Sequence, residues 1–520
     1  MLNSTDPKFS FSKDDFWLIV IVLVSFLVKN PFIDQPFLGH FGSYQAIVAM
    51  IATEYAKQDF HNFLYPNSFL LVNGLPALEM IYYPFAAFVA AALWKYFGGS
   101  LDYWGRMQSM LFTATAIVIS YYCAKKLQPN KKYALWVALF VAVSPMGLIY
   151  GRSFMNESSA LCFLMVSFLS LQYWAETRKL VYLIVSGILF SVALILRLHF
   201  ISAFLAYLFF IYKQPRDRKL KILVIFFITS FLLTGFWFWH TYQIVIHYSN
   251  VHTSLFVQLE KRPFPDILLL NPSFYVKVFA KEFFFRLYGP IVSLLMIASL
   301  FLNFIRKNLW ILLFYLGSFL LTILSPSKFY DHPFYLLPLV FPGALLAASM
   351  MTEIVERIPN RGSLFLIALV IISNVVVYWK PAFSQPSDQQ IFFEAVKYIR
   401  SRTHSSDRVL ALHGTSTDFL YYLNRNGYSF QIGPDRRADT YLNLKRRGNL
   451  SEEDYRQKLE ASKNAISWLE YMKQKNGTNY FAGVPKSDLD KDPNFRDYLK
   501  EKYTLVNREE DNFVLYRLDE

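Results

Sequence analysis

Cysteine is nearly absent from this chain of 520 residues, which contains only Cys123 and Cys162. Both lie in apolar segments, so the sequence has neither a disulfide framework nor the cysteine spacing of a zinc site. We expect both thiols to pack as small hydrophobic groups. The first apolar run, residues 16–28, is not followed by a small-x-small cleavage site. This favours an uncleaved membrane span over a removed signal peptide.

Charged residues are scarce, and none of the soluble parts carries a basic patch. Lys, Arg, Asp and Glu make up 17% of the chain, and the formal net charge is +14. Residues 385–520 hold 22 basic and 21 acidic side chains, a net charge of +1, so +13 belongs to residues 1–384. A nucleic-acid-binding protein concentrates cations on a soluble surface. We therefore expect no nucleic-acid partner.

Long apolar runs dominate the sequence, which is 54% hydrophobic and 18% aromatic. Runs of this length and uniformity are typical of membrane-spanning helices. The pattern predicts a polytopic α-helical membrane protein with about 11 transmembrane helices and additional interfacial helices. The predicted spans are residues 16–29, 106–124, 133–149, 157–175, 180–196, 198–212, 222–240, 288–305, 308–325, 334–352 and 363–379.

Basic residues fall in alternate loops between the predicted spans, and they set the orientation in the cell membrane. With the amino terminus inside, the cytoplasmic loops collect Lys and Arg, as the positive-inside rule requires. Residues 80–97 then cannot be a further span, so we expect an interfacial helix there. Two large loops, residues 30–105 and 241–287, and the C-terminal region lie outside in this topology. The basic loops are residues 125–132, 178–179, 213–221, 306–307 and 357–361.

The outer regions have secondary-structure patterns of their own. Apolar residues at helical spacing predict a surface helix over residues 44–57 in the first loop, and the aromatic and basic second loop is expected to lie on the membrane surface. From about residue 385 the composition is that of a soluble α/β domain. The chain is thus predicted to form a transmembrane domain, residues 1–384, and an extracytoplasmic domain, residues 385–520. Predicted elements of the second domain are helices over 388–403 and 417–427 and strands over 408–414 and 512–518.

Ionisable residues near the ends of the predicted spans are the first candidates for a functional site, because charge is costly at membrane depth. They fall on the outer side of the predicted topology, whereas unrelated snorkelling groups would scatter over both sides. The candidates are Asp34, His40, Glu79, Arg152, Glu157, Arg197, His199, His240, Asp331 and His332.

Most of these candidates also have an ordinary structural explanation. Asp34 is either a general base or a turn residue before Pro36, and His40 is either a site residue or an interfacial or capping group. Glu79 would lie in the first turn of the expected interfacial helix, where the macrodipole favours a carboxylate. The same explanation applies to Glu157 at the start of its predicted helix.

The remaining candidates are less specific. Arg197 either snorkels to the interface or holds a lipid-linked phosphate. Asp331 and His332 form an Asp-His dipeptide, which is a weak signal for a metal site.

Five sequence motifs in order resemble the GT-C membrane glycosyltransferases, and within them the prokaryotic protein-mannosyltransferase and aminoarabinose-transferase type. The resemblance covers about residues 15–350 and implies a lipid-phosphate-linked sugar donor, transfer on the outer face and inversion at the anomeric carbon. It places the family's acidic residues on Glu157 and Glu79. Members usually have another acidic residue within or just ahead of the first-loop helix, where this chain reads HFGSYQA. The motifs are AIVAMIATEY, LEMIYYPFAAFVAAALWKYFGG, WGRMQSMLF, SPMGLIYGRSFMNESSALCF and KFYDHPFYLLPLVFPGALL.

We therefore expect a glycosyltransferase that moves a sugar from a polyprenyl-phosphate carrier to a hydroxyl of a glycan, lipid or protein. Asp34, with His40 as its competitor, is the predicted general base. Glu157 would orient a cation or bind a divalent metal ion, and Glu79 would contact the sugar or the same metal. The residues expected to bind the phosphate are Arg152, Arg197, Lys281 and His332.

The alternative is a non-enzymatic flippase or transporter of lipid-linked sugars. A transporter is expected to have ionisable groups along a path through the bilayer and paired broken helices. The middle parts of the predicted spans are nearly free of ionisable groups, and no such pair is present in the sequence. Both observations favour the enzyme.

Overall fold

The computed structural model describes residues 13–214, 219–254, 267–302, 308–414, 417–432 and 451–518. The chain divides into two compact units. The helical unit consists of Met1–Ile33, Ser109–Thr234 and Pro265–Lys380, and the sheet unit consists of Asp34–Gln108, Gly235–Phe264 and Pro381–Glu520. Parts of the predicted basic loops, residues 215–218 and 306–307, lie outside the described residues.

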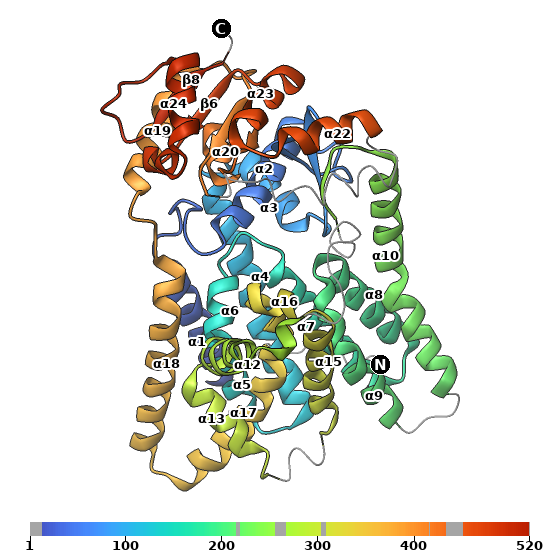
Figure 1. Cartoon of the computed structure of the whole chain (residues 1–520). Helices are drawn as coiled ribbons and strands as arrows, with labels where there is room; N and C mark the ends of the chain where they lie inside the picture. Colours follow the sequence, from blue (N-terminus) through green and yellow to red (C-terminus); the bar gives the residue numbers. More distant parts are fainter. Residues whose placement is uncertain are drawn as a thin grey trace. The chain divides into compact units, whose positions relative to one another are not determined.

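Apolar helices build the helical unit, and every predicted span coincides at least in part with one of them (Figure 1). The helices are α1 (Lys13–Lys29), α4 (Leu101–Leu127), α5 (Lys131–Val143), α6 (Pro145–Tyr150), α7 (Glu157–Thr177), α8 (Leu180–Leu196), η1 (Leu198–Ala203), α9 (Phe204–Lys213), α10 (Lys219–His247), η2 (Ile267–Leu270), α12 (Pro272–Tyr275), η3 (Val276–Tyr288), α13 (Pro290–Ser299), α15 (Trp310–Leu324), α16 (Pro326–Asp331), η4 (Pro333–Leu339), α17 (Val340–Arg357) and α18 (Asn360–Phe383). Of these, α4, α10 and α18 continue into the sheet unit.

Not every predicted span is a helix long enough to cross a membrane by itself. Within the described ranges, five helices have the required length and apolar composition, or six if a pair bent by 102° after η3 counts as one span. Several of the others are short or interrupted. The predicted span 133–149, for example, is broken between α5 and α6, where Ser144 precedes Pro145 and its hydroxyl caps the new helix at the Gly147 amide.

Among the described residues, eight strands form one mixed sheet in the sheet unit, in the order β3-β2-β1-β5-β4-β6-β8-β7. The strands β1, β5, β4 and β6 run parallel, and β8 is antiparallel to β6. The sheet extends beyond residues 385–520, because β1, β2 and β3 come from the two predicted outer loops. The strands are β1 (Asn67–Val72), β2 (Leu75–Met80), β3 (Val251–Ser254), β4 (Val409–Leu412), β5 (Gly427–Ser429), β6 (Tyr480–Gly483), β7 (Thr504–Leu505) and β8 (Val514–Arg517).

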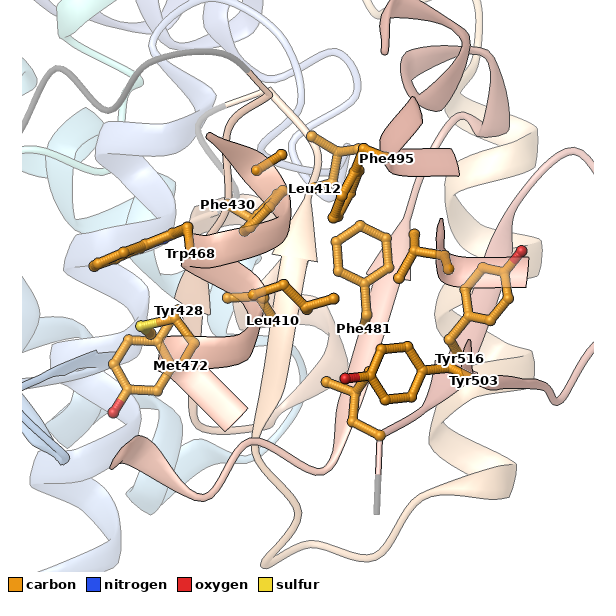
Figure 2. Close-up of a cluster of buried hydrophobic side chains, with 14 of the residues drawn as sticks. Leu410, Leu412, Tyr428, Phe430, Trp468, Met472, Phe481, Phe495, Tyr503 and Tyr516 are labelled. Carbon is orange, nitrogen blue, oxygen red and sulfur yellow. The ribbon is translucent and has the colours of Figure 1, made fainter. Parts of the chain in front are cut away.

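Side chains alternate between two hydrophobic clusters, one on each face of the sheet. Leu410 and Leu412 of β4 point into one cluster, which Figure 2 shows together with Phe481 and Phe495. Val409 of the same strand belongs to the other. The sheet therefore has a buried core on both faces. The helices of this unit are α2 (Gly42–Lys57), α3 (Phe85–Phe97), α19 (Gln389–Arg402), α20 (Thr417–Leu423), α22 (Glu452–Ala461), α23 (Ala465–Asn476), η5 (Lys486–Lys491) and α24 (Pro493–Lys502).

The expectation of a single interfacial helix over residues 80–97 is wrong at its start. Helix α3 begins only at Phe85, and the preceding segment is strand β2, paired with β1 in a hairpin. Asn73 and Gly74 form the turn with positive φ angles of 53° and 82°. An Asn-Gly pair between apolar runs is a strong hairpin signal, because both positions tolerate the left-handed conformation. The sequence carries that signal at Asn73.

The predicted elements of the soluble α/β domain are largely confirmed by α19, β4, α20 and β8. Helix α20, however, ends at Leu423 rather than at Gly427, because Asn424 adopts a left-handed conformation with φ 52°. Gly427 instead opens β5. A Cβ atom there would lie 2.2 Å from the carbonyl oxygen of Val409, so the close approach of β5 to β4 requires glycine.

The predicted second outer loop is also not one surface-lying segment. Its first residues continue α10 to His247, and Val251–Ser254 form strand β3 of the sheet. Residues 255–266 lie outside the described ranges. The remainder is helical in η2, α12 and η3.

Candidate active site

A buried ion pair joins Glu157 and Arg197 in the helical unit. Glu157 is the first residue of α7, and Arg197 directly follows α8. The Arg197 Nη2 atom lies 2.7 Å from Oε1 and 2.9 Å from Oε2 of Glu157. Neither side chain is more than 2% exposed. Removing each ion from water costs several kcal/mol, and the attraction between the two ions offsets a cost of about that size. Neither charge would therefore be stable at this site without the other.

The Phe334 ring on η4 gathers other candidates around this ion pair. The Arg197 guanidinium lies 5.3 Å from the centre of the Phe334 ring. The His332 ring lies 5.3 Å and the His199 ring 6.0 Å from the same centre. The structure therefore brings Glu157, Arg197 and His332 together, although they come from three separate segments of the sequence.

Arg152, in the same unit, binds backbone carbonyl groups at the end of α1. It is buried, and its Nη2 atom donates hydrogen bonds to the carbonyl oxygens of Pro31 at 3.2 Å and Phe32 at 3.0 Å. Arg152 thus fixes the chain where the first loop leaves α1. Nearby on α1, the buried Lys29 donates to Ser25 Oγ at 2.6 Å. A cation at the end of a span looks like a snorkelling residue in the sequence, so its burial had no sequence signal.

Lys281, the other predicted phosphate ligand, is exposed on η3. It makes no hydrogen bond or ion pair with the part of the chain that the structure describes. The next residue, Glu282, is buried and pairs with Arg286 at 2.9 Å. This pair was not among the sequence candidates. Its i,i+4 spacing on a helix is the signal that could have indicated it.

The predicted base Asp34 lies in the sheet unit, in the turn that follows α1. Its side chain is exposed, and its carboxylate accepts no hydrogen bond from a described residue. His40 packs its ring 4.5 Å from that of Phe41, and its carbonyl oxygen accepts a hydrogen bond from Gln45 Nε2. Asp34 is therefore an accessible carboxylate, whereas His40 is engaged at the start of α2.

Glu79 lies on strand β2, not in the first turn of a helix as expected. It is 6% exposed and accepts a hydrogen bond from Ser68 Oγ at 3.0 Å. His252 Nδ1 lies 3.0 and 3.1 Å from the two carboxylate oxygens. His252 was not a sequence candidate. It reaches Glu79 only because β3 pairs with β2, and no local sequence feature indicates that pairing.

The two predicted metal ligands, Glu79 and Glu157, differ in their surroundings. Among the described residues, no three His, Cys, Asp or Glu side chains form a group that could hold a metal ion. Glu157 faces Arg197, which competes with a cation for the carboxylate. Glu79 and His252 instead place a carboxylate oxygen and an imidazole nitrogen side by side. Two ligands at metal distances of about 2.0–2.1 Å in a tetrahedral site are about 3.3 Å apart, close to the spacing seen here.

Comparison with solved structures finds a similar fold in a protein that matches this chain over nearly its full length. The structure of ArnT from Cupriavidus metallidurans bound to undecaprenyl phosphate matches with a TM-score of 0.60 and 12% sequence identity. The match covers 96% of this chain and 98% of ArnT. The chain has the GT-C fold. The resemblance drawn from the five sequence motifs is thus confirmed at the level of fold.

Two further GT-C structures agree. The Archaeoglobus fulgidus oligosaccharyltransferase in complex with Zn and sulfate has a TM-score of 0.55 at 11% identity, covering 91% of this chain and 68% of that one. The mycobacterial arabinofuranosyltransferase AftD has a TM-score of 0.53 at 14% identity, covering 98% of this chain and 40% of AftD. No family model and no curated protein matches the sequence. The similarity to these proteins is therefore a similarity of fold.

Proposed function

We propose that this protein is a membrane glycosyltransferase that moves a sugar from a polyprenyl-phosphate-linked donor to an acceptor hydroxyl on the outer face of the cell membrane. The observation that carries the proposal is the match over almost the full length of both chains to ArnT, a protein solved with bound undecaprenyl phosphate. The match includes the sheet unit as well as the helices. The acceptor is a glycan, a lipid or a protein.

In the proposed reaction the acceptor oxygen attacks the anomeric carbon from the side opposite the phosphate. The new carbon–oxygen bond forms as the bond to the phosphate oxygen breaks, so the sugar configuration inverts. The acceptor proton passes to the Asp34 carboxylate, and the polyprenyl phosphate leaves with the bonding electrons. Asp34 is the favoured base because its carboxylate is exposed and accepts no hydrogen bond from a described residue. General-base help of this kind contributes about 10²–10⁴-fold.

The leaving phosphate requires cations near the developing negative charge. Lys281 is exposed on η3 and is the most accessible of the proposed phosphate ligands. Arg197 is held by Glu157, so that Glu157 orients a cation and does not take the proton. His332 shares the Phe334 ring with Arg197, and Arg152 is proposed as a further phosphate ligand.

A divalent cation, if the enzyme uses one, fits Glu79 and His252 better than Glu157. A bound cation would supply positive charge to stabilise the leaving phosphate and would orient the groups around it. The chain's own contribution is to hold the donor atoms. Ser68 donates to the Glu79 carboxylate, and strand pairing fixes His252 beside it. Hydrogen bonds of this kind orient metal ligands.

Mass spectrometry of the cell-envelope glycans provides the test of the function. A strain without this gene should lack one sugar substituent, and the wild-type gene should restore it. The missing substituent would identify both the sugar and the acceptor. The purified protein in vesicles should transfer that sugar from its polyprenyl phosphate and leave polyprenyl phosphate behind.

The same vesicles separate the enzyme from the flippase or transporter. A transporter would move the lipid-linked sugar between leaflets without breaking the bond to phosphate. Release of free polyprenyl phosphate only when acceptor is present supports the transferase. Movement of intact donor without any cleavage would overturn it.

A further inference from the structure

The first-loop segment that carries Asp34 is fixed by residues from distant parts of the sheet unit. The amide nitrogen of Phe37 donates a hydrogen bond to Tyr422 Oη at 2.7 Å. Gln35 Nε2 donates to the carbonyl oxygen of Ala382 at 3.0 Å. Gln385 Nε2 donates to the carbonyl oxygen of Pro36 at 3.4 Å. Three successive residues after Asp34 are thus bound to the C-terminal part of the chain.

Asp102 at the start of α4 joins the same network. The Tyr421 hydroxyl donates to Asp102 Oδ1, and the Tyr422 hydroxyl donates to Asp102 Oδ2, both at 2.7 Å. Asp102 is 8% exposed, so both oxygens of a buried carboxylate are satisfied by α20. The Phe37 amide, the Tyr422 hydroxyl and the Asp102 carboxylate form a continuous chain of donors and acceptors. Such chains strengthen each member, because each hydrogen bond polarises the next.

One helical turn further along α4, Arg106 holds the other side of the segment. Its guanidinium donates to the carbonyl oxygen of Gln35 and lies 4.6 Å from the centre of the Phe37 ring. Phe37 is fully buried. A cation over an aromatic face is attracted to the ring, and the attraction is stronger when the cation is desolvated. The backbone immediately after Asp34 is therefore held on two sides.

The backbone of residues 39–42 packs closely against neighbouring backbone. A Cβ atom on Gly39 would lie 2.5 Å from the carbonyl oxygen of Ser384, and one on Gly42 would lie 2.2 Å from that of Phe37. Both contacts are with backbone, which cannot move aside as a flexible side chain does. The glycines therefore allow the segment to fold tightly against its neighbours.

The location of α20 in the sheet explains why it is suited to this task. Helix α20 follows the carboxyl end of β4, and β4 has β5 on one side and β6 on the other. In open α/β sheets ligands bind at this point, where the strand order reverses. Here Thr417 Oγ1 at the start of α20 donates to the carbonyl oxygen of Ser43. The edge that commonly binds a ligand is thus used to hold the protein's own first loop.

We propose that Asp102, Tyr421 and Tyr422 are positioning residues that set the location of Asp34 for transfer. This inference rests on the proposed function, and it gives the C-terminal domain a role in the reaction at the first loop. The Asp34 side chain is bound by no described residue, so its position depends on the backbone around it, including the residues that follow it. A displacement of about 1 Å at a reacting group can reduce a rate about 100-fold.

The test compares Tyr422→Phe with two matched variants in the full-length protein. Tyr421→Phe also removes one hydrogen bond to Asp102, but Tyr421 makes no hydrogen bond to the loop backbone. Tyr498→Phe removes a partly buried tyrosine–carboxylate bond of 2.8 Å, to Glu470, in the same unit. Tyr498→Phe should transfer at the wild-type rate.

Three measurements are made on each variant: sugar substituent restored to the deletion strain, affinity for undecaprenyl phosphate, and hydrogen exchange of peptides covering residues 34–42. Tyr422→Phe should lower transfer by at least about tenfold. Its loop peptides should exchange faster, while its affinity for undecaprenyl phosphate stays within about twofold of wild type. Tyr421→Phe should show a smaller loss of transfer. A role limited to folding would lower all activities together and would not leave lipid binding intact.

The outcomes separate the inference from the function on which it rests. If wild-type protein restores no sugar substituent, the proposed function fails. If wild type transfers and Tyr422→Phe matches Tyr498→Phe in transfer and exchange, the positioning role is overturned. Faster exchange in the loop with unchanged transfer would also overturn it, because the loop would then be held without consequence for the reaction.

Discussion

Arg197 Nη2 contacts both carboxylate oxygens of Glu157, at 2.7 and 2.9 Å, in a part of the helical unit where neither side chain is more than 2% exposed. The ion pair lies between the first residue of α7 and the residue after α8, so it ties the start of one helix to the end of the next. Glu157 also benefits from the positive end of the α7 dipole. Its burial is thus explained by its partner and by its helix.

This geometry predicts that the effects of the two single substitutions on stability do not add in the double variant. Glu157→Leu and Arg197→Met should each destabilise the protein by about 3–5 kcal/mol, because each leaves a buried charge without its partner. The double variant Glu157→Leu/Arg197→Met should recover much of the loss, since no charge remains buried. The measurement is the midpoint of thermal unfolding in detergent. Single variants that unfold at the wild-type midpoint, or a double variant that shows the sum of both losses, would contradict the pairing.

The proposed base gives a sharper prediction on activity. Asp34→Asn preserves the size of an exposed side chain but cannot accept the proton, so transfer should fall about 10²–10⁴-fold with unchanged thermal stability. Asp59→Asn is the matched control, because Asp59 is also a first-loop carboxylate and pairs with Lys95 on the surface. The sugar substituent restored to the deletion strain is measured for both. Equal restoration by the two variants would remove Asp34 from the reaction.

Glu79 and His252 predict a metal-dependent property that does not require an activity assay. Purified protein equilibrated with Zn²⁺ and then desalted should retain about one equivalent, since carboxylate and imidazole are common zinc ligands. Glu79→Gln and His252→Gln should each lower retention at least about tenfold. His404→Gln is the control, because His404 is an exposed histidine whose ring nitrogen Nδ1 is hydrogen-bonded to the hydroxyl and the amide of Ser406. Equal retention by all four proteins, measured by elemental mass spectrometry, would count against this site.

The sequence predicts well those features whose signal is local. Long apolar runs identify the helices, and the short apolar run that includes Val409 and Leu410 identifies a strand. The signal for the Asn73–Gly74 turn is also local, but the prediction of a helix from residue 80 does not use it. Asp34 and Glu157 are candidates because charge is unusual beside an apolar span.

The features that the sequence does not predict depend on pairing between distant segments. Glu79 meets His252 across 173 positions of sequence, through two short strands. Asp102 meets Tyr421 across 319 positions, through a helix that belongs to the C-terminal segment. Hydropathy and periodicity describe each segment separately, so they contain no information on which segments meet. The predicted boundary at residue 385 follows the change in composition, whereas the sheet includes strands from both sides of it.

Glu470 provides a pH-dependent prediction in the sheet unit. Burial of the carboxyl raises its pKa, but hydrogen bonds from Tyr503, Tyr498 and Lys502 outweigh burial, so the net pKa lies below its ordinary value. A depressed pKa in the folded state contributes stability above the ordinary pKa, and this stability is lost as the pH falls through the folded-state value. Glu470→Gln should therefore unfold at a lower temperature than wild type at pH 7, and the difference should shrink toward zero in strong acid. A difference that stays constant between pH 7 and the acid range, measured by thermal unfolding in detergent, would mean that the hydrogen bonds stabilise the charged and neutral carboxyl equally.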